Sequence, residues 1–488
     1  MYNPTSFYFS PRDEQSYKRI NEKTVIWDIT KTCNLKCIHC YNSERYSASD
    51  EDLVTSEFKE YMDTFSKWGV KHLHFLGGEP LIRNDLIELI KHAKSKNIKV
   101  TLNTNGTLVT DKRSKELIES GIDQIAFSLD GATPKTNDYI RGNGTYEKVI
   151  SGIKTLKQAA KSNQSDLQIG IAFTMTSINL NELSQVIEVG IENEVDVIDF
   201  QEYYSSGRAL THKGLSYSRV QVVDALEELM KYISENQERV RRSRINIQVD
   251  TWYPTAIYLE RKYRTGLTYN PKNISCSGGV RIIYVDSIGK IHPCGITNNP
   301  IYNKGPISDG LLKLQGFTPL EFETMEDLNK SPYFRSFFNL RGNKSKNQDK
   351  EPCHTCEYRN LCVFCPFLHY NDYRIGECAE ALRRDRDFES LVENTFPVIK
   401  DDRIKKMDGG YKVFDEKYNR YRSVLGTGSF ILRGIEESQP NVSVKDLIDS
   451  VQLTFPNTDR RQVERDTIDF VWWLYLLHSV QLLKPNTH

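Results

Sequence analysis

The chain has 488 residues, and 65 lysines and arginines balance 65 aspartates and glutamates, so its formal net charge is zero. No overall field therefore favours nucleic acid or an anionic membrane surface. The first residues lack the basic and apolar segments of a secretory signal, and the longest apolar run, residues 470–477, is far shorter than the roughly 20 residues that cross a bilayer. We expect a soluble cytoplasmic protein of two to four domains, whose ten cysteines bind metals rather than form disulfides.

Residues 1–22 are polar and aromatic without a clear period, which predicts an N-terminal arm. Apolar strand-like runs and amphipathic helical stretches then alternate as far as residue 204. The predicted strands are residues 24–30, 71–77, 98–103, 124–129, 168–176 and 195–203. The predicted helices between them are residues 56–67, 85–95, 114–120, 146–160 and 181–193. Six βα units in a row indicate an α/β fold built on a parallel sheet, with ligands at the carboxyl ends of its strands.

Cys33, Cys37 and Cys40 follow the first predicted strand with the spacing C-x3-C-x2-C. Thiolates are the ligands of iron–sulfur clusters, and three of them leave one iron of a four-iron cluster without a protein ligand. An open metal position is typical of a reactive site. The spacing alone also fits zinc held with the help of His39, or three buried thiols without a metal.

Polar clusters end the next three predicted strands. Residues 77–80 (Gly-Gly-Glu-Pro) combine glycines, which allow close approach of the backbone to a ligand, with a carboxylate that can accept an ammonium group. Residues 103–106 (Asn-Thr-Asn-Gly) and 128–131 (Ser-Leu-Asp-Gly) suit ribose hydroxyls and a carboxylate. Each cluster alone is compatible with a plain turn. Their recurrence at successive strand ends favours ligand contact.

The cysteine loop, the aromatic Tyr41 that follows it and residues 77–80 together resemble the radical S-adenosylmethionine (radical SAM) superfamily. The resemblance implies a partial (β/α)6 barrel and a [4Fe–4S] cluster on the three cysteines, whose open iron chelates S-adenosylmethionine. Cleavage of that cosubstrate would give a 5′-deoxyadenosyl radical that abstracts a hydrogen atom. The implied catalytic residues are Cys33, Cys37 and Cys40, and the implied cofactor contacts are Tyr41, Gly77, Gly78, Glu79, Asn103, Ser128, Asp130 and Arg141.

Two further positions match the family. Arg141 stands where an arginine pairs with the methionyl carboxylate, a task that suits its planar fork, although a solvated surface arginine is equally compatible. Residues 207–209 (Gly-Arg-Ala), after the sixth predicted strand, resemble a signature that recurs in maturases of this kind. The role of that signature is left open by the sequence.

Seven more cysteines lie between residues 276 and 378. Residues 281–285 and 290–292 predict a β-hairpin between the first two, and the group C-x2-C-x5-C-x2-C that follows could form a zinc knuckle. Behind a radical SAM core, however, the arrangement resembles a SPASM domain with two auxiliary [4Fe–4S] clusters. The resemblance assigns Cys276, Cys294 and Cys365 to the first auxiliary cluster and Cys353, Cys356, Cys362 and Cys378 to the second.

Two departures from the SPASM pattern affect this assignment. Only two residues separate Cys362 from Cys365, where the family usually has three, so these two cysteines could exchange roles. Three clusters would use all ten cysteines, and the first auxiliary cluster then has no fourth cysteine. We hypothesise that its open iron could bind a substrate group.

The tail predicts a hairpin of residues 411–414 and 420–424, three helices over residues 428–437, 444–454 and 460–478, and a short strand at residues 481–483. This order resembles the PqqD-like RiPP recognition element, which binds the leader of a precursor peptide as an added strand. A winged-helix-like or dimerisation module is the alternative. The predicted domains are an arm (1–22), a radical SAM core (23–245), an auxiliary-cluster domain with a bridging region (246–390) and a PqqD-like domain (396–488).

These patterns predict a radical SAM/SPASM maturase that oxidises a ribosomally made peptide, forming a carbon–carbon or thioether crosslink. Its partners would be the precursor peptide and an electron donor such as flavodoxin or ferredoxin. An anaerobic sulfatase-type maturase that converts Cys or Ser to formylglycine is the alternative enzyme. A non-catalytic iron–sulfur carrier or zinc scaffold is the alternative from another class. Asp250, Tyr203 and His292 are candidate bases that the sequence does not rank.

Overall fold

The computed structural model describes residues 23–43, 51–251, 253–265, 268–271, 278–295, 297, 316–342, 354, 375–400, 403–415 and 420–484. The chain divides into two compact units. The core unit holds residues 14–256 and 267–379, and the C-terminal unit includes residues 257–266 and 380–488. Within the described ranges, no helix is both long and apolar enough to cross a bilayer.

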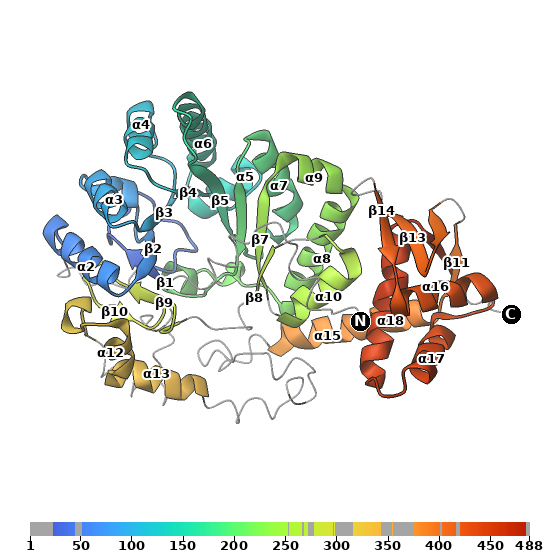
Figure 1. The fold of residues 1–488 in the computed structure, drawn as a ribbon. Helices are drawn as coiled ribbons and strands as arrows, with labels where there is room; N and C mark the ends of the chain where they lie inside the picture. Colours follow the sequence, from blue (N-terminus) through green and yellow to red (C-terminus); the bar gives the residue numbers. More distant parts are fainter. Residues whose placement is uncertain are drawn as a thin grey trace. The chain divides into compact units, whose positions relative to one another are not determined.

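A largely parallel sheet forms the centre of the core unit (Figure 1). Its strands lie in the order β10-β9-β1-β2-β3-β4-β5-β6-β7-β8, and β10 runs antiparallel to β9. The bounds are β1 (Lys23–Asp28), β2 (Val70–Leu76), β3 (Lys99–Thr104), β4 (Gln124–Ser128), β5 (Gln168–Thr174), β6 (Val197–Gln201), β7 (Asn246–Thr251), β8 (Thr268–Pro271), β9 (Ile282–Val285) and β10 (Ile291–His292). The six expected strands, β1 to β6, are confirmed as parallel neighbours in chain order.

Helices alternate with these strands, and α2, α3, α4, α6 and α7 lie along one side of the sheet (Figure 1). The helices of the core unit are α2 (Thr55–Lys67), α3 (Leu86–Ser95), α4 (Asp111–Glu119), α5 (Pro134–Arg141), α6 (Thr145–Ser162), α7 (Leu183–Glu192), α8 (Arg219–Glu235), α9 (Gln237–Ser243), α12 (Met325–Lys330) and α13 (Pro332–Gly342), and α10 (Tyr253–Tyr263) and α15 (Ile375–Glu393) run on into the C-terminal unit. The five predicted helices are confirmed, with small shifts of their ends. Helix α5 was not predicted.

The two faces of the sheet differ in chemistry because successive side chains of a strand point to opposite sides. The helix-covered face is apolar: Trp27 of β1 is fully buried, with its ring 4.6 Å from that of Phe58 on α2. On β2, Leu73 and Phe75 are likewise buried, whereas His74 between them is only half-buried. A parallel sheet covered on both faces is apolar throughout. Because the half-buried His74 lies between two buried apolar residues, the inner face of the sheet, opposite the helices, is polar at this strand.

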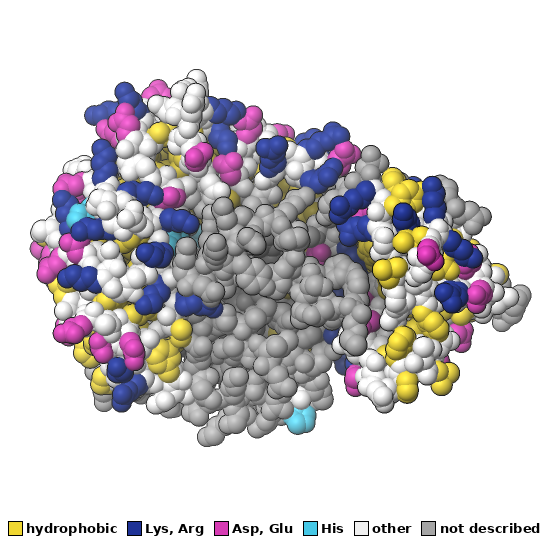
Figure 2. Space-filling view, in the orientation of Figure 1, with side chains coloured by type: hydrophobic (Ala, Val, Ile, Leu, Met, Phe, Trp, Pro, Cys, Tyr) yellow, Lys and Arg dark blue, Asp and Glu magenta, His cyan; other side chains and the backbone are white. Residues whose placement is uncertain are grey.

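The core sheet extends beyond residue 245, where the sequence placed the end of the core. Strands β7 and β8 continue it in parallel after β6. At the other edge, β9 pairs in parallel with β1, so the predicted hairpin β9–β10 is confirmed but joins the core sheet. Lys, Arg, Asp and Glu side chains are interspersed on the surface of the core unit that Figure 2 draws, in keeping with the zero net charge.

In its described residues, the C-terminal unit contains two small antiparallel sheets and the helices α16, α17 and α18, beside the parts of α10 and α15 that belong to it. Strands β12, β13 and β14 form one sheet in that order, and β11 pairs with β15 in the other. The bounds are β11 (Phe396–Ile399), β12 (Ile404–Met407), β13 (Gly410–Asp415), β14 (Arg420–Val424), α16 (Gly426–Ser438), α17 (Val444–Thr454), α18 (Arg460–Leu476) and β15 (Val480–Leu483). The predicted hairpin β13–β14, the three helices and the last strand are confirmed, and β11 and β12 were not predicted.

A buried ion-pair network ties residues 257–266 to the rest of the C-terminal unit. The Arg261 side chain, 6% exposed, lies 2.6 Å from Asp385 and 2.9 Å from Glu389 of α15. Asp385 also lies 2.9 Å from Arg465 of α18. Buried charges persist only when they are paired, so removal of one partner would leave the others uncompensated.

Candidate active site at the carboxyl ends of the strands

The cysteine loop leaves the carboxyl end of β1 and packs against the loop that follows β2. The amides of Gly78 and Glu79 donate to the carbonyls of Thr30 (2.7 Å) and Thr32 (2.8 Å). A Cβ atom on Gly78 would lie 2.0 Å from the Thr32 carbonyl, and one on Gly77, whose φ is +127°, would lie 2.3 Å from that of Thr30. The close approach expected of these glycines is therefore made to the backbone that carries the cysteines.

The Glu79 carboxylate is buried and joins three segments of the site. Its Oε1 accepts hydrogen bonds from the Leu81 amide (3.0 Å) and the Thr104 hydroxyl (2.7 Å), and its Oε2 accepts one from the Asn105 amide (2.7 Å). Burial raises the pKa of Glu79 against the effect of these donors and of Arg141. A carboxylate oxygen has about two acceptor positions, so Oε2 retains one for an ammonium group.

Asp130 and Arg141, predicted separately as cofactor contacts, lie against each other. The Arg141 Nε is 2.5 Å from Asp130 Oδ2, and His39, within the cysteine loop, places its Nε2 at 2.9 Å from the same oxygen. The Thr174 amide donates to Asp130 Oδ1 at 2.7 Å. Burial opposes ionisation of Asp130, yet the Arg141 guanidinium and the His39 imidazole outweigh it and lower its pKa to about 2. His39 thus contacts a carboxylate through its Nε2.

The end of α5 holds the middle of the cysteine loop. The Ile38 amide donates to the Ile140 carbonyl at 3.0 Å, and the Cys37 thiol lies 3.8 Å from the Arg141 carbonyl. On the opposite flank, Asn105 Nδ2 donates to the Asn34 side chain at 2.8 Å. Segments after β2, β3 and β4 therefore all contact the loop, as the placement of ligands at the strand ends requires.

The remaining predicted contacts are spread around this edge. Tyr41 is 39% exposed, and its carbonyl accepts a hydrogen bond from the Ser206 hydroxyl (2.8 Å). Ser128 is half-buried at the end of β4, where it pairs with Ala172 of β5. Asn103 of β3 is set deeper and lines a pocket on the inner face.

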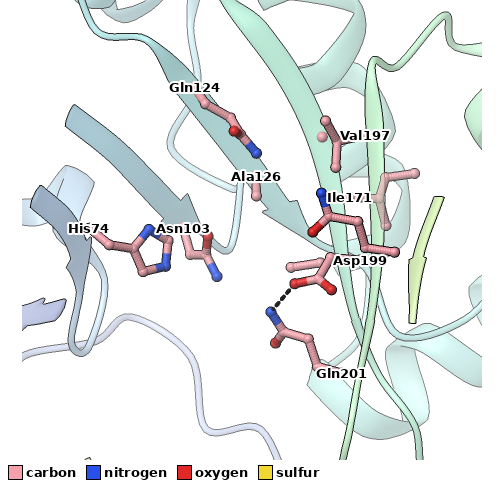
Figure 3. A pocket seen from close by; sticks show the side chains of 11 residues that line it. His74, Asn103, Gln124, Ala126, Ile171, Val197, Asp199 and Gln201 are labelled. Atoms are coloured by element: carbon pink, nitrogen blue, oxygen red, sulfur yellow. Dashed lines mark hydrogen bonds between the residues drawn. The ribbon is translucent and has the colours of Figure 1, made fainter. Parts of the chain in front are cut away.

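That pocket has a cavity volume of about 80 Å³ and is lined by strands β2 to β7 (Figure 3). The Gln201 amide donates to the Asp199 carboxylate at 2.8 Å, and burial lowers the pKa of His74 to about 3. Four carboxamides, one carboxylate and one imidazole line it, and the described lining residues include no lysine or arginine. The lining is His74, Asn103, Gln124, Ala126, Gly170, Ile171, Ala172, Val197, Asp199, Gln201 and Gln248.

Sequence reasoning missed most of this inner wall and the pairing of His39. Of the three candidate bases, Tyr203 donates its hydroxyl to the Ala209 carbonyl (3.3 Å), and His292 is buried between Asp286 and Tyr333, at 3.1 Å from each. The side chain of Asp250 lies outside the described residues, and so do Cys276, Cys353, Cys356, Cys362 and Cys365. Cys294 and Cys378 are half-buried thiols.

The three thiols of the loop suit an iron–sulfur cluster. Cys33 is exposed, Cys37 and Cys40 are half-buried, and all three are free. Burial raises the pKa of the Cys37 thiol to about 11, against the opposing charge of Arg141, and a bound cation would reverse this by stabilising the thiolate. Across the described part of the chain, no three Cys, His, Asp or Glu side chains converge on a single metal ion.

Comparison with known proteins agrees with this site. Residues 27–188, which include the end of β1, the cysteine loop and strands β2 to β5, match the Radical SAM superfamily. The chain is a radical SAM enzyme. Enzymes of this superfamily bind S-adenosylmethionine and a [4Fe–4S] cluster, and the cysteine loop is the part of this chain that fits the cluster.

Several curated proteins resemble this radical SAM enzyme, two of the following three over about 70% of its length. An AdoMet-dependent heme synthase of Methanosarcina barkeri is 27% identical over 353 residues, which are 70% of this chain and 90% of that protein. A PqqA peptide cyclase of Bradyrhizobium diazoefficiens is 25% identical over 342 residues, 69% of this chain and 79% of that protein. Mycofactocin maturase MftC of Mycolicibacterium smegmatis is 29% identical over 36% of this chain and 44% of its own.

Solved structures share the fold. Streptococcus suis SuiB bound to S-adenosylmethionine superimposes with a TM-score of 0.52 at 17% identity, covering 70% of this chain and 74% of its own. Native anSMEcpe with bound AdoMet gives a TM-score of 0.53 at 18% identity, covering 75% of this chain and 97% of its own. At such identities the likeness establishes the α/β radical SAM fold.

Proposed function

We propose that this radical SAM enzyme is a maturase that oxidises a ribosomally made precursor peptide, forming a carbon–carbon or thioether crosslink. The observation that carries the proposal is the chemistry of the inner wall. Its carboxamides, at Asn103, Gln124, Gln201 and Gln248, can both donate to and accept from peptide groups. The relatives named for heme synthesis raise a tetrapyrrole as the other candidate. The propionate carboxylates of a tetrapyrrole would meet Asp199 and find no lysine or arginine among the described residues that line the pocket.

Cys33, Cys37 and Cys40 would hold the catalytic cluster, and the last acceptor position of Glu79 Oε2 would receive the ammonium group of S-adenosylmethionine. When bound, the cluster and this cosubstrate supply a carbon radical that removes a hydrogen atom from the substrate. The residues of the inner wall would hold the C–H bond in reach, which is a positioning task. Asp130 would act through its partners, because it fixes Arg141 and His39 beside the cluster loop.

Net oxidation requires an acceptor for a further electron from the substrate. The seven cysteines between residues 276 and 378 would hold two auxiliary [4Fe–4S] clusters that take this electron, with the assignment given by the SPASM resemblance. An electron donor such as flavodoxin or ferredoxin would reduce the catalytic cluster. The first auxiliary cluster, with three cysteines, would keep one iron open to a substrate group.

The C-terminal unit would bind the leader of the precursor. Its sheet β12-β13-β14 has β12 and β14 at its edges, and the chain preserves the order of a hairpin followed by three helices that resembles a RiPP recognition element. An extended leader could join one of these edges as a fourth strand, with main-chain hydrogen bonds to that edge supplying affinity. A bound leader would raise the local concentration of the core peptide, which explains the fusion of such a unit to an enzyme.

The proposal predicts that removal of the Asp199–Gln201 pair weakens peptide processing. In the Asp199→Asn, Gln201→Ala double variant, we expect the KM for a precursor peptide encoded beside the gene to rise about tenfold, which corresponds to about 1.4 kcal/mol, the size of one or two hydrogen bonds. Mass spectrometry would follow the loss of two hydrogen atoms from the peptide. Gln185→Ala, which alters an exposed glutamine on α7, is the matched control. An unchanged KM in the double variant would contradict the proposed wall.

A further inference from the structure

The Gly-Arg-Ala signature at residues 207–209 has a structural partner that its sequence did not reveal. It forms the start of the short 3-10 helix η4 (Gly207–Leu210), six residues after the end of β6, and it lies against the second half of the cysteine loop. The segment that follows β6 therefore contacts this loop, as do the segments that follow β2, β3 and β4.

Arg208 reaches the backbone of two cysteines. Its Nε donates to the Cys37 carbonyl at 3.0 Å. Its backbone amide donates to the Ser43 hydroxyl at 2.7 Å, and that hydroxyl in turn donates to the Cys40 carbonyl at 3.0 Å. One residue therefore restrains the peptide units of two of the three candidate cluster ligands, directly at Cys37 and through Ser43 at Cys40.

Ser206 and Gly207, which precede Arg208, also contact the second half of the cysteine loop. The Ser206 side chain, 1% exposed, donates to the Tyr41 carbonyl at 2.8 Å. Gly207 has φ +58°, and a Cβ atom there would lie 2.5 Å from the Cys40 carbonyl and 2.7 Å from that of Ser43. Only glycine satisfies both the left-handed conformation and the close approach. Each residue of Ser-Gly-Arg therefore has its own part in this contact. The serine donates a hydrogen bond, the glycine permits the close approach and the arginine binds the Cys37 carbonyl.

The loop is consequently held from two sides. The end of α5 binds it through Ile38 and Cys37, and η4 binds it from Cys37 to Ser43. The η4 side brings a guanidinium, which carries its positive charge at any working pH, next to the cysteine that both sides share. A cation beside a thiolate-bound cluster stabilises the extra negative charge of the reduced form, and hydrogen bonding and local charge are among the factors that set cluster potentials.

We propose that Arg208 is a positioning residue of the catalytic cluster, which fixes the Cys37–Ser43 half of the loop and raises the reduction potential of the cluster. The inference rests on a cluster at Cys33, Cys37 and Cys40, and it is independent of whether the substrate is a peptide. Arg208 acts on the cluster through the backbone and its charge, and it need not contact substrate.

Redox titration of the anaerobically reconstituted full chain, followed by electron paramagnetic resonance, tests this role without any substrate. We expect Arg208→Gln to shift the midpoint potential of the catalytic cluster to more negative values and to alter the spectrum of its reduced form. Arg208→Lys, which keeps the charge but not the planar fork, should restore most of the potential. Arg113→Gln is the matched control, because Arg113 is also half-buried and contacts a backbone carbonyl, that of Leu81 at 3.4 Å.

A wild-type potential and spectrum in Arg208→Gln would overturn the proposal. Should that variant fail to retain iron, Ser43→Ala provides a second measurement, because it removes only the hydroxyl between Arg208 and Cys40. We expect Ser43→Ala to lose iron to a chelator faster than wild type and to show an altered reduced spectrum. Wild-type behaviour in both respects would equally overturn the role. Because no peptide is present, failure here leaves the maturase proposal untouched.

Discussion

Replacement of Cys33, Cys37 and Cys40 by alanine in one variant is expected to abolish release of 5′-deoxyadenosine from S-adenosylmethionine under reducing, anaerobic conditions. These are the three thiols of the loop that the strand ends hold in place, and thiolates are the ligands that such a cluster requires. Without them, the proposed cluster that would deliver an electron to the sulfonium cannot form. Chromatography of the quenched reaction measures the product directly, and iron analysis should show the loss of about one cluster's share of the metal.

Leader binding by the same variant is the control for correct folding. The C-terminal unit has its own sheets, helices and ion-pair network, so the proposed leader binding should survive the loss of the cluster. Fluorescence anisotropy of a labelled leader peptide would measure it. Release of 5′-deoxyadenosine by a folded triple variant would refute the assignment of the catalytic cluster.

The second large effect is expected from Glu79→Ala. This change leaves the Leu81 amide, the Thr104 hydroxyl and the Asn105 amide without their acceptor in a buried site. Each unpaired buried donor costs about 1–3 kcal/mol, so we expect the free energy of unfolding to fall by roughly 3 kcal/mol or more. The loss of the carboxylate should also weaken S-adenosylmethionine binding, which equilibrium titration would measure on the folded fraction.

Glu182→Ala separates these two effects. Glu182 also accepts a hydrogen bond from a backbone amide, that of Ala132 at 2.7 Å, and one from the Thr136 hydroxyl, but it is not in contact with the cysteine loop. We expect it to lower stability by a smaller amount, about 1–2 kcal/mol, and to leave S-adenosylmethionine binding unchanged. A Glu79→Ala protein as stable as wild type, measured by urea unfolding, would show that the three donors find other partners.

Much of the core could be predicted because its signals are local. Within strand β2, residues 72–75 (His-Leu-His-Phe) alternate polar and apolar side chains, which indicates a strand with one buried face. Helix α5 could have been found from Thr133 and Pro134, which provide its N-cap and first residue. The addition of β9 to β1 joins residues about 260 positions apart, and no local pattern specifies such a partner.

The sequence indicated candidate site residues but not the contacts between them. Strand-end position pointed to Glu79 and Asp130, and the family resemblance pointed to Arg141, yet the contact between Asp130 and Arg141 depends on the unpredicted α5. The glycines were correctly expected to permit a close approach, but the partner is the Thr30–Cys33 backbone and the sequence gives no sign of it. The polar inner wall had a usable signal in the alternation along β6, where Asp199 and Gln201 interrupt an apolar strand.

The transfer of a hydrogen isotope tests the central claim most directly. A precursor peptide carrying deuterium throughout its core residues would be incubated with the reconstituted enzyme, S-adenosylmethionine and a reductant, and the 5′-deoxyadenosine would be analysed by mass spectrometry. We expect deuterium in the 5′-deoxyadenosine, together with a peptide that has lost two hydrogen atoms at the modified positions. Unlabelled 5′-deoxyadenosine and an unaltered peptide, with decarboxylation of an added iron porphyrin instead, would contradict the account.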